Sequence, residues 1–380
     1  MANSTKYLLK LAFIFKFIGY WLWYLLALVI LVLTQFPEGV SKYYTNGFFK
    51  WLGLSLRKVS GLFPNAIGEY VYLFIIIMLI INILRSLYQY KDQYKNNKNF
   101  KPILQTFFVK SLKNLTQLYV LFMLIWGLNY QQSSPAKQFG IEVKESYSDV
   151  AIERLTIELI EELNSTRAQI PDSSISQLTI KQIFSNAIQD YAQLEPSYPF
   201  LKLQQPNLKL ARFPAIGDYI GFMAYYQPIT GEAIIRGDVP KLTLPFTTCH
   251  EMAHQLGYAS ETEANFIAFV VGSESRQPIF KYSMLLQLFT YAQSAELTFI
   301  AKTGNFENWK KVVARNKSLL SPVVLADRKK IKLFFIERQD LLIPASTSMY
   351  NQFLQWNKQA KGIESYNDVL LWALAYRSNK

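Results

Sequence analysis

The sequence is poor in the side chains from which many small binding sites are built. It contains one cysteine, Cys249, and two histidines, His250 and His254, in 380 residues. A single cysteine excludes an intrachain disulfide scaffold and a Cys-rich zinc finger. The two histidines must carry any imidazole chemistry. Apolar residues make up 51% of the chain and aromatic residues 15%, which excludes a disordered protein and predicts a packed core.

Acidic residues are scarce in the first third of the chain. Residues 1–136 contain 14 Lys or Arg and only three Asp or Glu, whereas residues 137–380 contain 26 Lys or Arg and 24 Asp or Glu. The net charge of +13 therefore belongs mainly to the first third. Because this part is also rich in long apolar runs, its basic charge indicates a membrane anchor and not a surface for nucleic acid.

Three apolar segments of the first third predict transmembrane helices. Residues 17–34 form a run of 18 residues without a charge, which is long enough to cross the roughly 30 Å hydrocarbon core. No small-residue cleavage site follows this run, so we expect an uncleaved anchor and not a signal peptide. The other two spans are expected at residues 66–84 and 115–130. The last is short enough to be a buried core helix instead.

The basic residues also predict an orientation. Residues 85–113 carry seven Lys or Arg against one Asp, so this connection and the N-terminus are expected in the cytoplasm. Four basic residues between the first two spans oppose this bias without reversing it. With three spans, the chain after Tyr130 is expected on the extracytoplasmic side of the membrane. Without the third span, it lies in the cytoplasm.

A polar, turn-forming segment at residues 127–140 predicts a linker between an anchor over residues 1–136 and a globular domain over residues 140–380. A short alternating run at 208–212 and a hairpin of 219–226 with 232–236 predict a small antiparallel sheet. The expected fold class is therefore membrane-anchored α+β, with a mostly α-helical domain. Its helices are expected at residues 148–163, 179–194, 279–299, 306–316, 323–342, 347–357 and 366–376.

The two histidines are spaced for metal binding. His250 and His254 lie four residues apart and Glu251 follows the first, which makes the pattern HExxH. On a helix both imidazoles share one face and reach one zinc ion, while the glutamate serves as a base for the metal-bound water. With only two histidines in the chain, chance produces this spacing in roughly one of a few thousand such sequences. Pro245 and Gly257 fit the start and the end of this helix.

A third ligand must be an oxygen, because no further histidine exists. On a helix Cys249 is rotated about 100° from His250 and cannot share its metal-facing side. Glu261 and Glu263 follow at the start of the next helix, which Ser260 caps. Both remain open at this point, as does a more distant residue. Glu263 stands in the capping-box relation to Ser260 and can accept a bond from its backbone N–H instead.

The string HEMAH followed by EANFIAF resembles the gluzincin type of zincin metallopeptidase, in which two HExxH histidines and a glutamate of the following helix hold zinc. This resemblance implies Glu263 as the third ligand. It also implies a strand beside the active-site helix that pairs with a peptide substrate, for which we expect residues 232–236. The three spans, the GLNY segment and the HEMAHQLGYASETEANF core also resemble an uncharacterised bacterial membrane-anchored family.

The function implied is that of a membrane-tethered zinc metallopeptidase, whose partners are the lipid bilayer and a protein or peptide substrate on the extracytoplasmic side, with no nucleic acid. Zn²⁺ is the expected cofactor and Glu251 the expected catalytic base. Tyr226 and Arg236 are expected to bind substrate, because no histidine is left for that task. The alternative is a catalytically inactive zinc-binding or scaffold protein of the cell envelope.

Overall fold

The computed structural model describes residues 21–338 and 366–379, apart from residues 98, 99, 145, 303 and 305. These residues belong to two compact units. The first comprises the described chain up to Phe49 together with Gly68–Gln132, and the second comprises Lys50–Ile67 together with the described chain from Ser133 onward. The helix expected at 347–357 and the last residues of the one expected at 323–342 lie outside the described residues.

The first unit is built from apolar helices. Residues 21–33 are helical, and the further helices are α2 (Pro37–Gly39), η1 (Val40–Phe49), α4 (Ile67–Asn97), α5 (Phe100–Ile125) and η2 (Gly127–Gln131). Two stretches, Ile67–Asp92 and Leu104–Ile125, are long and apolar enough to cross a membrane. Among the described residues, which do not include positions 17–20 of the first expected span, a third candidate exists only if the bent pair Trp21–Leu33 and Pro37–Gly61 counts as one span. These two or three apolar helices are thus compatible with membrane association.

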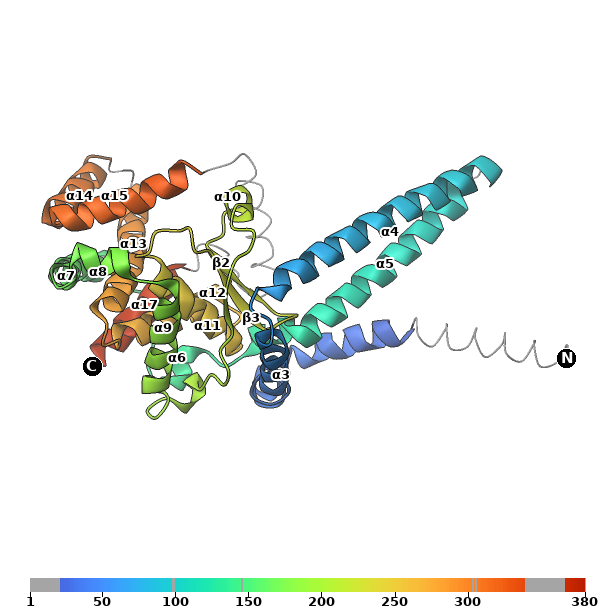
Figure 1. The fold of residues 1–380 in the computed structure, drawn as a ribbon, viewed down its shortest axis with the longest axis horizontal. Helices are drawn as coiled ribbons and strands as arrows, with labels where there is room; N and C mark the ends of the chain where they lie inside the picture. The colour runs from blue at the N-terminus through green and yellow to red at the C-terminus, as the bar shows by residue number, and fades with distance from the viewer. Residues whose placement is uncertain are drawn as a thin grey trace. The chain divides into compact units, whose positions relative to one another are not determined.

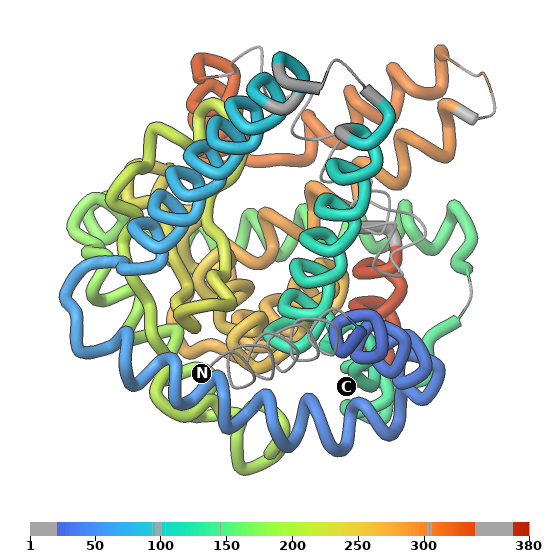
Figure 2. Tube along the Cα trace, turned by 90° about the vertical axis from the view of Figure 1, so that its right-hand side faces the viewer, coloured from blue at the N-terminus to red at the C-terminus, as the bar shows by residue number. Residues whose placement is uncertain are grey.

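The boundaries of these helices differ from the prediction. The third apolar helix begins before residue 115 and ends at Ile125, because Lys110 lies within the helix and does not interrupt it. The connection expected as a loop over residues 85–113 is helical up to Asn97 and again from Phe100, since residues 85–101 contain no Gly or Pro to break a helix. Figure 2 shows α4 and α5 converging toward their connection.

The second unit is mostly helical. Its helices are α3 (Lys50–Gly61), α6 (Pro135–Gln138), α7 (Asp149–Ala168), α8 (Asp172–Gln177), α9 (Ile180–Leu194), η3 (Pro199–Leu201), α10 (Ile216–Ile220), α11 (Leu244–Gln255), α12 (Glu261–Ser273), α13 (Pro278–Lys302), α14 (Phe306–Leu319), α15 (Pro322–Ile336) and α17 (Tyr366–Ser378). The expected helices are confirmed wherever residues are described. Their apolar faces meet in one core, where Leu159, Ile183, Phe266 and Phe289 are fully buried.

Local sequence signals set several of these helices. Thr179 and Gln182 form a capping box at the start of α9, and the Ser148 side chain caps α7. In the segment expected as a linker, Ser134 caps the short helix α6 and Ala136 is buried. This segment therefore contributes to the core of the second unit and is not a simple exposed linker.

The sheet of the second unit has three strands, β1 (Leu208–Leu210), β2 (Ala224–Gln227) and β3 (Glu232–Ile235), in the order β1-β3-β2. β2 and β3 form the expected antiparallel hairpin, but β1 pairs parallel to β3. The prediction of an antiparallel sheet was therefore wrong for β1, because its alternating pattern does not specify the direction of a partner so distant in sequence. Helix α11 packs on β2 and β3 (Figure 1).

Helix α3 is an integral part of the second unit, although it precedes the candidate spans α4 and α5. The buried Arg57 guanidinium donates to the backbone oxygen of Gln204 at 3.1 and 3.2 Å and to that of Gln255 at 3.2 Å. Ser60 Oγ donates to the Thr230 carbonyl at 2.7 Å. Since Gln255 ends α11, the helix of the HExxH pattern, residues outside the predicted 140–380 domain stabilise that helix.

This arrangement predicts a stability effect of Arg57. We expect Arg57→Gln to lower the free energy of unfolding of the second unit by about 1–3 kcal/mol, because buried carbonyls lose their donor. The full chain in detergent would be unfolded with heat while near-ultraviolet circular dichroism and the amide exchange of residues 244–255 are followed. The matched control is Lys58→Gln, an exposed position on the same helix. Equal stability of the two variants would contradict a role of α3 in this fold.

Candidate metal centre

The two histidines lie on a fully buried helix that has the predicted start and end. Pro245 lies in the first turn of α11, and every residue of the helix is buried. Gly257 follows with φ +98°, a left-handed conformation that reverses the chain without strain. After Ser260 the chain enters α12, which packs against α11. The reversal therefore brings the first turn of α12 to the HExxH face.

Three side chains converge there. His250 Nε2 and His254 Nε2 lie 3.1 Å apart. The Glu261 carboxylate lies 3.3 Å from His250 Nε2 and 3.7 Å from His254 Nε2. These three residues form a group that could hold a metal ion, with ligand atoms all within 4.8 Å of one another. The histidines are 9% and 6% exposed, so bulk water screens the site little.

The backbone fixes the orientation of His254. Its Nδ1 lies 2.6 Å from the carbonyl oxygen of Tyr258. Because a carbonyl only accepts, we assign the proton to Nδ1, which leaves the Nε2 lone pair directed at His250. Burial, with the neighbouring His250, lowers the pKa of His254 to about 4. His254 is thus neutral at physiological pH, as a metal ligand must be.

His250 has a different environment. Burial lowers the pKa of its imidazole, but the carboxylates of Glu261 and Glu251 outweigh burial and raise it. Its Nδ1 has no hydrogen-bond partner among the described residues. The nitrogen of His250 that a cation at this site would bind is Nε2, which lies near His254 Nε2 and the Glu261 carboxylate.

Glu251 is the second carboxylate of the site and, unlike the half-buried Glu261, it is buried. The residue is 4% exposed, and Oε2 has no hydrogen-bond partner in the described part of the chain. Burial raises the pKa of Glu251 to about 8, with a further increase from Glu261 and an opposing decrease from His250. A carboxyl group with a pKa near neutrality and a free oxygen is suited to accept and return a proton.

The structure brings Glu261 to the imidazoles, not Glu263. The two residues differ by about 200° around the helix axis, so only one of them faces α11. The carboxylate of Glu263 instead accepts from the backbone N–H of Ser260, and burial raises its pKa to about 8. This is the capping interaction that was the alternative use of Glu263. In this structure the alternative ligand, Glu261, occupies the place that the resemblance implied for Glu263.

Asn265 is a further residue of the site that the sequence analysis missed. It lies one turn after Glu261 on α12, is 3% exposed, and forms a side-chain hydrogen bond that raises the pKa of His250. The spacing of small residues in α12 indicates which face of this helix packs on α11. Ala264 and Ala268 lie on the same side of the helix as Glu261 and Asn265, and their small side chains allow α12 to approach α11 closely. A helical-wheel comparison of Glu261 and Glu263 would have favoured Glu261.

The two expected substrate-binding residues lie in different environments. The Tyr226 ring lies beside His254, with ring centroids 6.5 Å apart, so Tyr226 belongs to the surroundings of the site. The Arg236 guanidinium is 2% exposed and forms ion pairs with Asp218 and Asp238, each at 2.7 Å. These carboxylates also raise the pKa of Arg236. Such an arrangement favours a structural role of Arg236 in holding the loops on either side of β2 and β3.

The strand expected to pair with a substrate is not available for pairing. β3 is the central strand and is buried along its whole length. β2 instead forms one edge of the sheet and packs on α11. Because Arg236 N donates to Met223 O at 3.0 Å, the antiparallel alternation turns the peptide groups of Ala224 away from β3. The outer side of β2 has no neighbouring strand among the described residues.

Comparison with known proteins gives a family but no reaction. Residues 44–374 match the model of a family described as a protein of unknown function, DUF3810. The chain belongs to this family. The matched segment includes α11, α12 and the candidate spans α4 and α5. No curated protein and no solved structure matches the chain. The functional proposal is therefore based on the geometry of the site.

The convergence of His250, His254 and Glu261 predicts which carboxylate is needed for metal binding. We expect Glu261→Ala to reduce zinc affinity at least about 100-fold, while Glu263→Gln keeps it within a few fold. Zinc affinity would be measured by competition with a chromophoric chelator on the full chain in detergent. Loss of affinity in the Glu263 variant with retention in the Glu261 variant would restore the ligand that the family resemblance implied.

Asp190 predicts a pH dependence of stability. It is 6% exposed, and burial raises its pKa to about 6 although it accepts a hydrogen bond from Ser275. The folded state therefore holds this proton more tightly than the unfolded state, and stability is lost as the pH rises from about 4 to about 6. We expect Asp190→Asn to raise the free energy of unfolding by about 1–3 kcal/mol at pH 8 and to have little effect at pH 4. Urea unfolding at both pH values checks this; an equal effect at both would contradict it.

Proposed function

We propose that the chain is a membrane-anchored zinc metallopeptidase. The observation that carries the proposal is the convergence of His250 Nε2, His254 Nε2 and the Glu261 carboxylate beside the buried Glu251. In a tetrahedral zinc site with bonds of about 2.0–2.1 Å, ligand atoms lie about 3.3–3.4 Å apart. The separations of 3.1, 3.3 and 3.7 Å lie around this value. Three protein ligands leave a fourth position open, as in catalytic zinc sites.

Each group of the site has a separate role in the proposed hydrolysis. Zinc, when bound, would polarise the scissile carbonyl and acidify water. Glu251 accepts the proton of the attacking water and delivers it to the leaving amine. Its pKa of about 8 falls when positive charge is held at the neighbouring imidazoles, so the carboxylate is ionised at neutral pH. The Tyr258 carbonyl keeps His254 in the tautomer that presents Nε2.

The edge of the sheet offers a track for a peptide main chain. β2 packs on α11 and turns the peptide groups of Ala224 outward, where an extended peptide can add as a further strand. Tyr226, two residues along, lies beside His254. A substrate on this edge therefore passes the imidazoles, which supports peptide hydrolysis over hydrolysis of a small ester or phosphate.

The fold also supports a site outside the cytoplasm. Residues 50–67 and the chain from Ser133 onward belong to one compact unit, so both segments lie on the same side of a membrane. The two candidate spans between them return the chain to that side, as this requires. The basic residues 85–113 lie around the connection between α4 and α5, at the opposite ends of these helices. By the positive-inside rule, these basic residues support a connection in the cytoplasm and a candidate metal site outside it.

The role assigned to Glu251 is tested by Glu251→Gln. We expect this variant to lose about 100- to 10,000-fold in kcat/KM against a peptide library, because the amide cannot take a proton, while zinc stays bound at one per chain. The full chain in detergent would be assayed with metal analysis on the same samples. The matched control is Glu161→Gln, an exposed carboxylate on α7.

Two other outcomes separate the alternatives. Stoichiometric zinc with no difference between wild type and Glu251→Gln would indicate a zinc-binding protein without catalysis. Wild-type protein that binds no zinc would contradict the metal site itself.

A further inference from the structure

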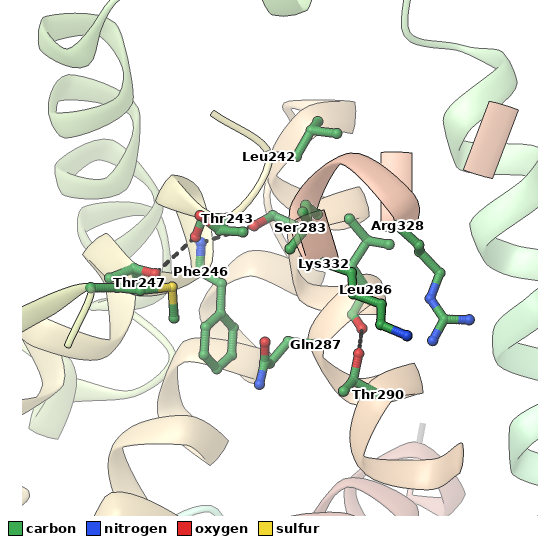
Figure 3. A pocket seen from close by; sticks show the side chains of 12 residues that line it. Leu242, Thr243, Phe246, Thr247, Ser283, Leu286, Gln287, Thr290, Arg328 and Lys332 are labelled. Atoms are coloured by element: carbon green, nitrogen blue, oxygen red, sulfur yellow. Dashed lines mark hydrogen bonds between the residues drawn. The ribbon is translucent and has the colours of Figure 1, made fainter. Parts of the chain in front are cut away.

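A pocket of about 280 Å³ lies in the second unit between the start of α11 and the helices α13 and α15. Phe246 and Thr247 line one side and Arg328 and Lys332 the other (Figure 3). Arg328 and Lys332 are four residues apart on α15 and so share one face of that helix. Neither the metal ligands nor Glu251 line this pocket, so the hydrolytic chemistry does not account for it.

The pocket is basic. None of the residues that line it carries a carboxylate, and neither Arg328 nor Lys332 forms an ion pair with a carboxylate among the described residues. The Arg328 guanidinium lies over the Phe289 ring, 4.5 Å from its centroid, and donates to Gln293 Oε1 at 2.8 Å. Both partners are neutral, so the positive charge stays uncompensated. Burial lowers the pKa of this guanidinium accordingly.

The hydroxyl groups of Thr247, Ser283 and Thr290 in the pocket already form hydrogen bonds within the protein. Thr247 Oγ1 donates to the Thr243 carbonyl at 2.9 Å, and Thr290 Oγ1 donates to the Leu286 carbonyl at 2.8 Å. Ser283 Oγ accepts from the backbone N–H of Phe246 at 3.1 Å. These neutral groups do not require a ligand. The cations of Arg328 and Lys332 are the groups that a ligand can neutralise. A carboxylate does so by a charge-assisted hydrogen bond to the arginine.

The pocket adjoins the metal centre. The Phe246 and His250 ring centroids lie 6.2 Å apart, and Thr247 lies one turn before Glu251 on α11. Met223, which also lines the pocket, directly precedes the edge strand β2. One end of β2 therefore lies at the pocket, and the other end, at Tyr226, lies at His254. A peptide that pairs antiparallel with β2 runs from the His254 end toward the pocket.

We propose that this pocket selects a peptide substrate with an acidic side chain on the C-terminal side of the cleaved bond, and that Arg328, with Lys332, binds its carboxylate. The proposal rests on the proposed peptidase function and names the substrate class of that site. The apolar Phe246 and Leu286 contact the methylene part of the side chain, and the cations at the far wall bind its charge.

The test uses peptides that differ in one residue. Internally quenched peptides with acetylated and amidated ends carry Glu, Gln or Lys at each position across the cleaved bond, so the only variable charge is the scanned side chain. We expect zinc-loaded full-length protein to cleave the Glu peptide at least about tenfold faster than the Gln peptide, in kcat/KM, at one position after the cleaved bond. We expect Arg328→Gln to reduce that ratio to within about twofold.

Control variants separate charge in the pocket from charge in general. Lys330→Gln removes one positive charge from an exposed position of the same helix, outside the pocket, and is expected to keep the full Glu preference. Lys332→Glu, also at an exposed position, is expected to shift the preference toward the Lys peptide and covers the case that the Arg328 variant does not fold. A Gln peptide with a free C-terminal carboxylate shows whether the pocket takes a chain terminus instead.

The outcomes distinguish this proposal from the peptidase proposal. Cleavage with equal rates for Glu and Gln peptides, or a Glu preference that survives both pocket variants, would overturn the pocket assignment and leave the peptidase intact. If zinc-loaded protein cleaves no peptide, the peptidase proposal fails. The pocket is then judged by fluorescence anisotropy of the labelled peptides on Glu251→Gln protein, where tighter binding of the Glu peptide must depend on Arg328.

Discussion

The candidate metal site depends on two imidazole nitrogens that face each other 3.1 Å apart among buried side chains. Contacts from several elements of the second unit hold this pair beside the carboxylates of Glu251 and Glu261. The left-handed Gly257 turns the Tyr258 carbonyl onto His254. Small side chains on α12 let Glu261 approach. The buried Arg57 of α3 bonds to the last residue of α11. A cation that binds these side chains would add its binding free energy to the stability of the unit.

Helix α3 contacts the helix of the HExxH pattern, although the candidate membrane helices separate the two in the sequence. Residues 50–67 precede the two candidate spans α4 and α5, yet they complete the unit that carries α11. The chain therefore contributes a first segment to this unit, continues through α4 and α5, and then contributes the remainder of the unit. The candidate metal site thus lies in a compact unit that includes residues from both sides of these helices in sequence.

Much of this was predictable because the signals are local. Pro245, Gly257 and the capping residues mark helix ends, and the HExxH spacing places both imidazoles on one face. The misses share one cause, which is that the deciding contacts are distant in sequence. The direction of β1, the role of Arg57 and the pocket around Arg328 depend on partners that no local pattern specifies. Glu261 is the exception, because Ala264 and Ala268 on its side of α12 are a local signal for the face that packs closely on α11.

The central claim is that His250, His254 and Glu261 hold one zinc ion through nitrogen and oxygen atoms. X-ray absorption at the zinc edge on the purified full chain tests it most directly. We expect one zinc per chain with two imidazole nitrogens and oxygen ligands at about 2.0–2.2 Å and no sulfur, and loss of stoichiometric zinc in His254→Ala. Protein without stoichiometric zinc, or zinc with a sulfur ligand at about 2.3 Å, would contradict it.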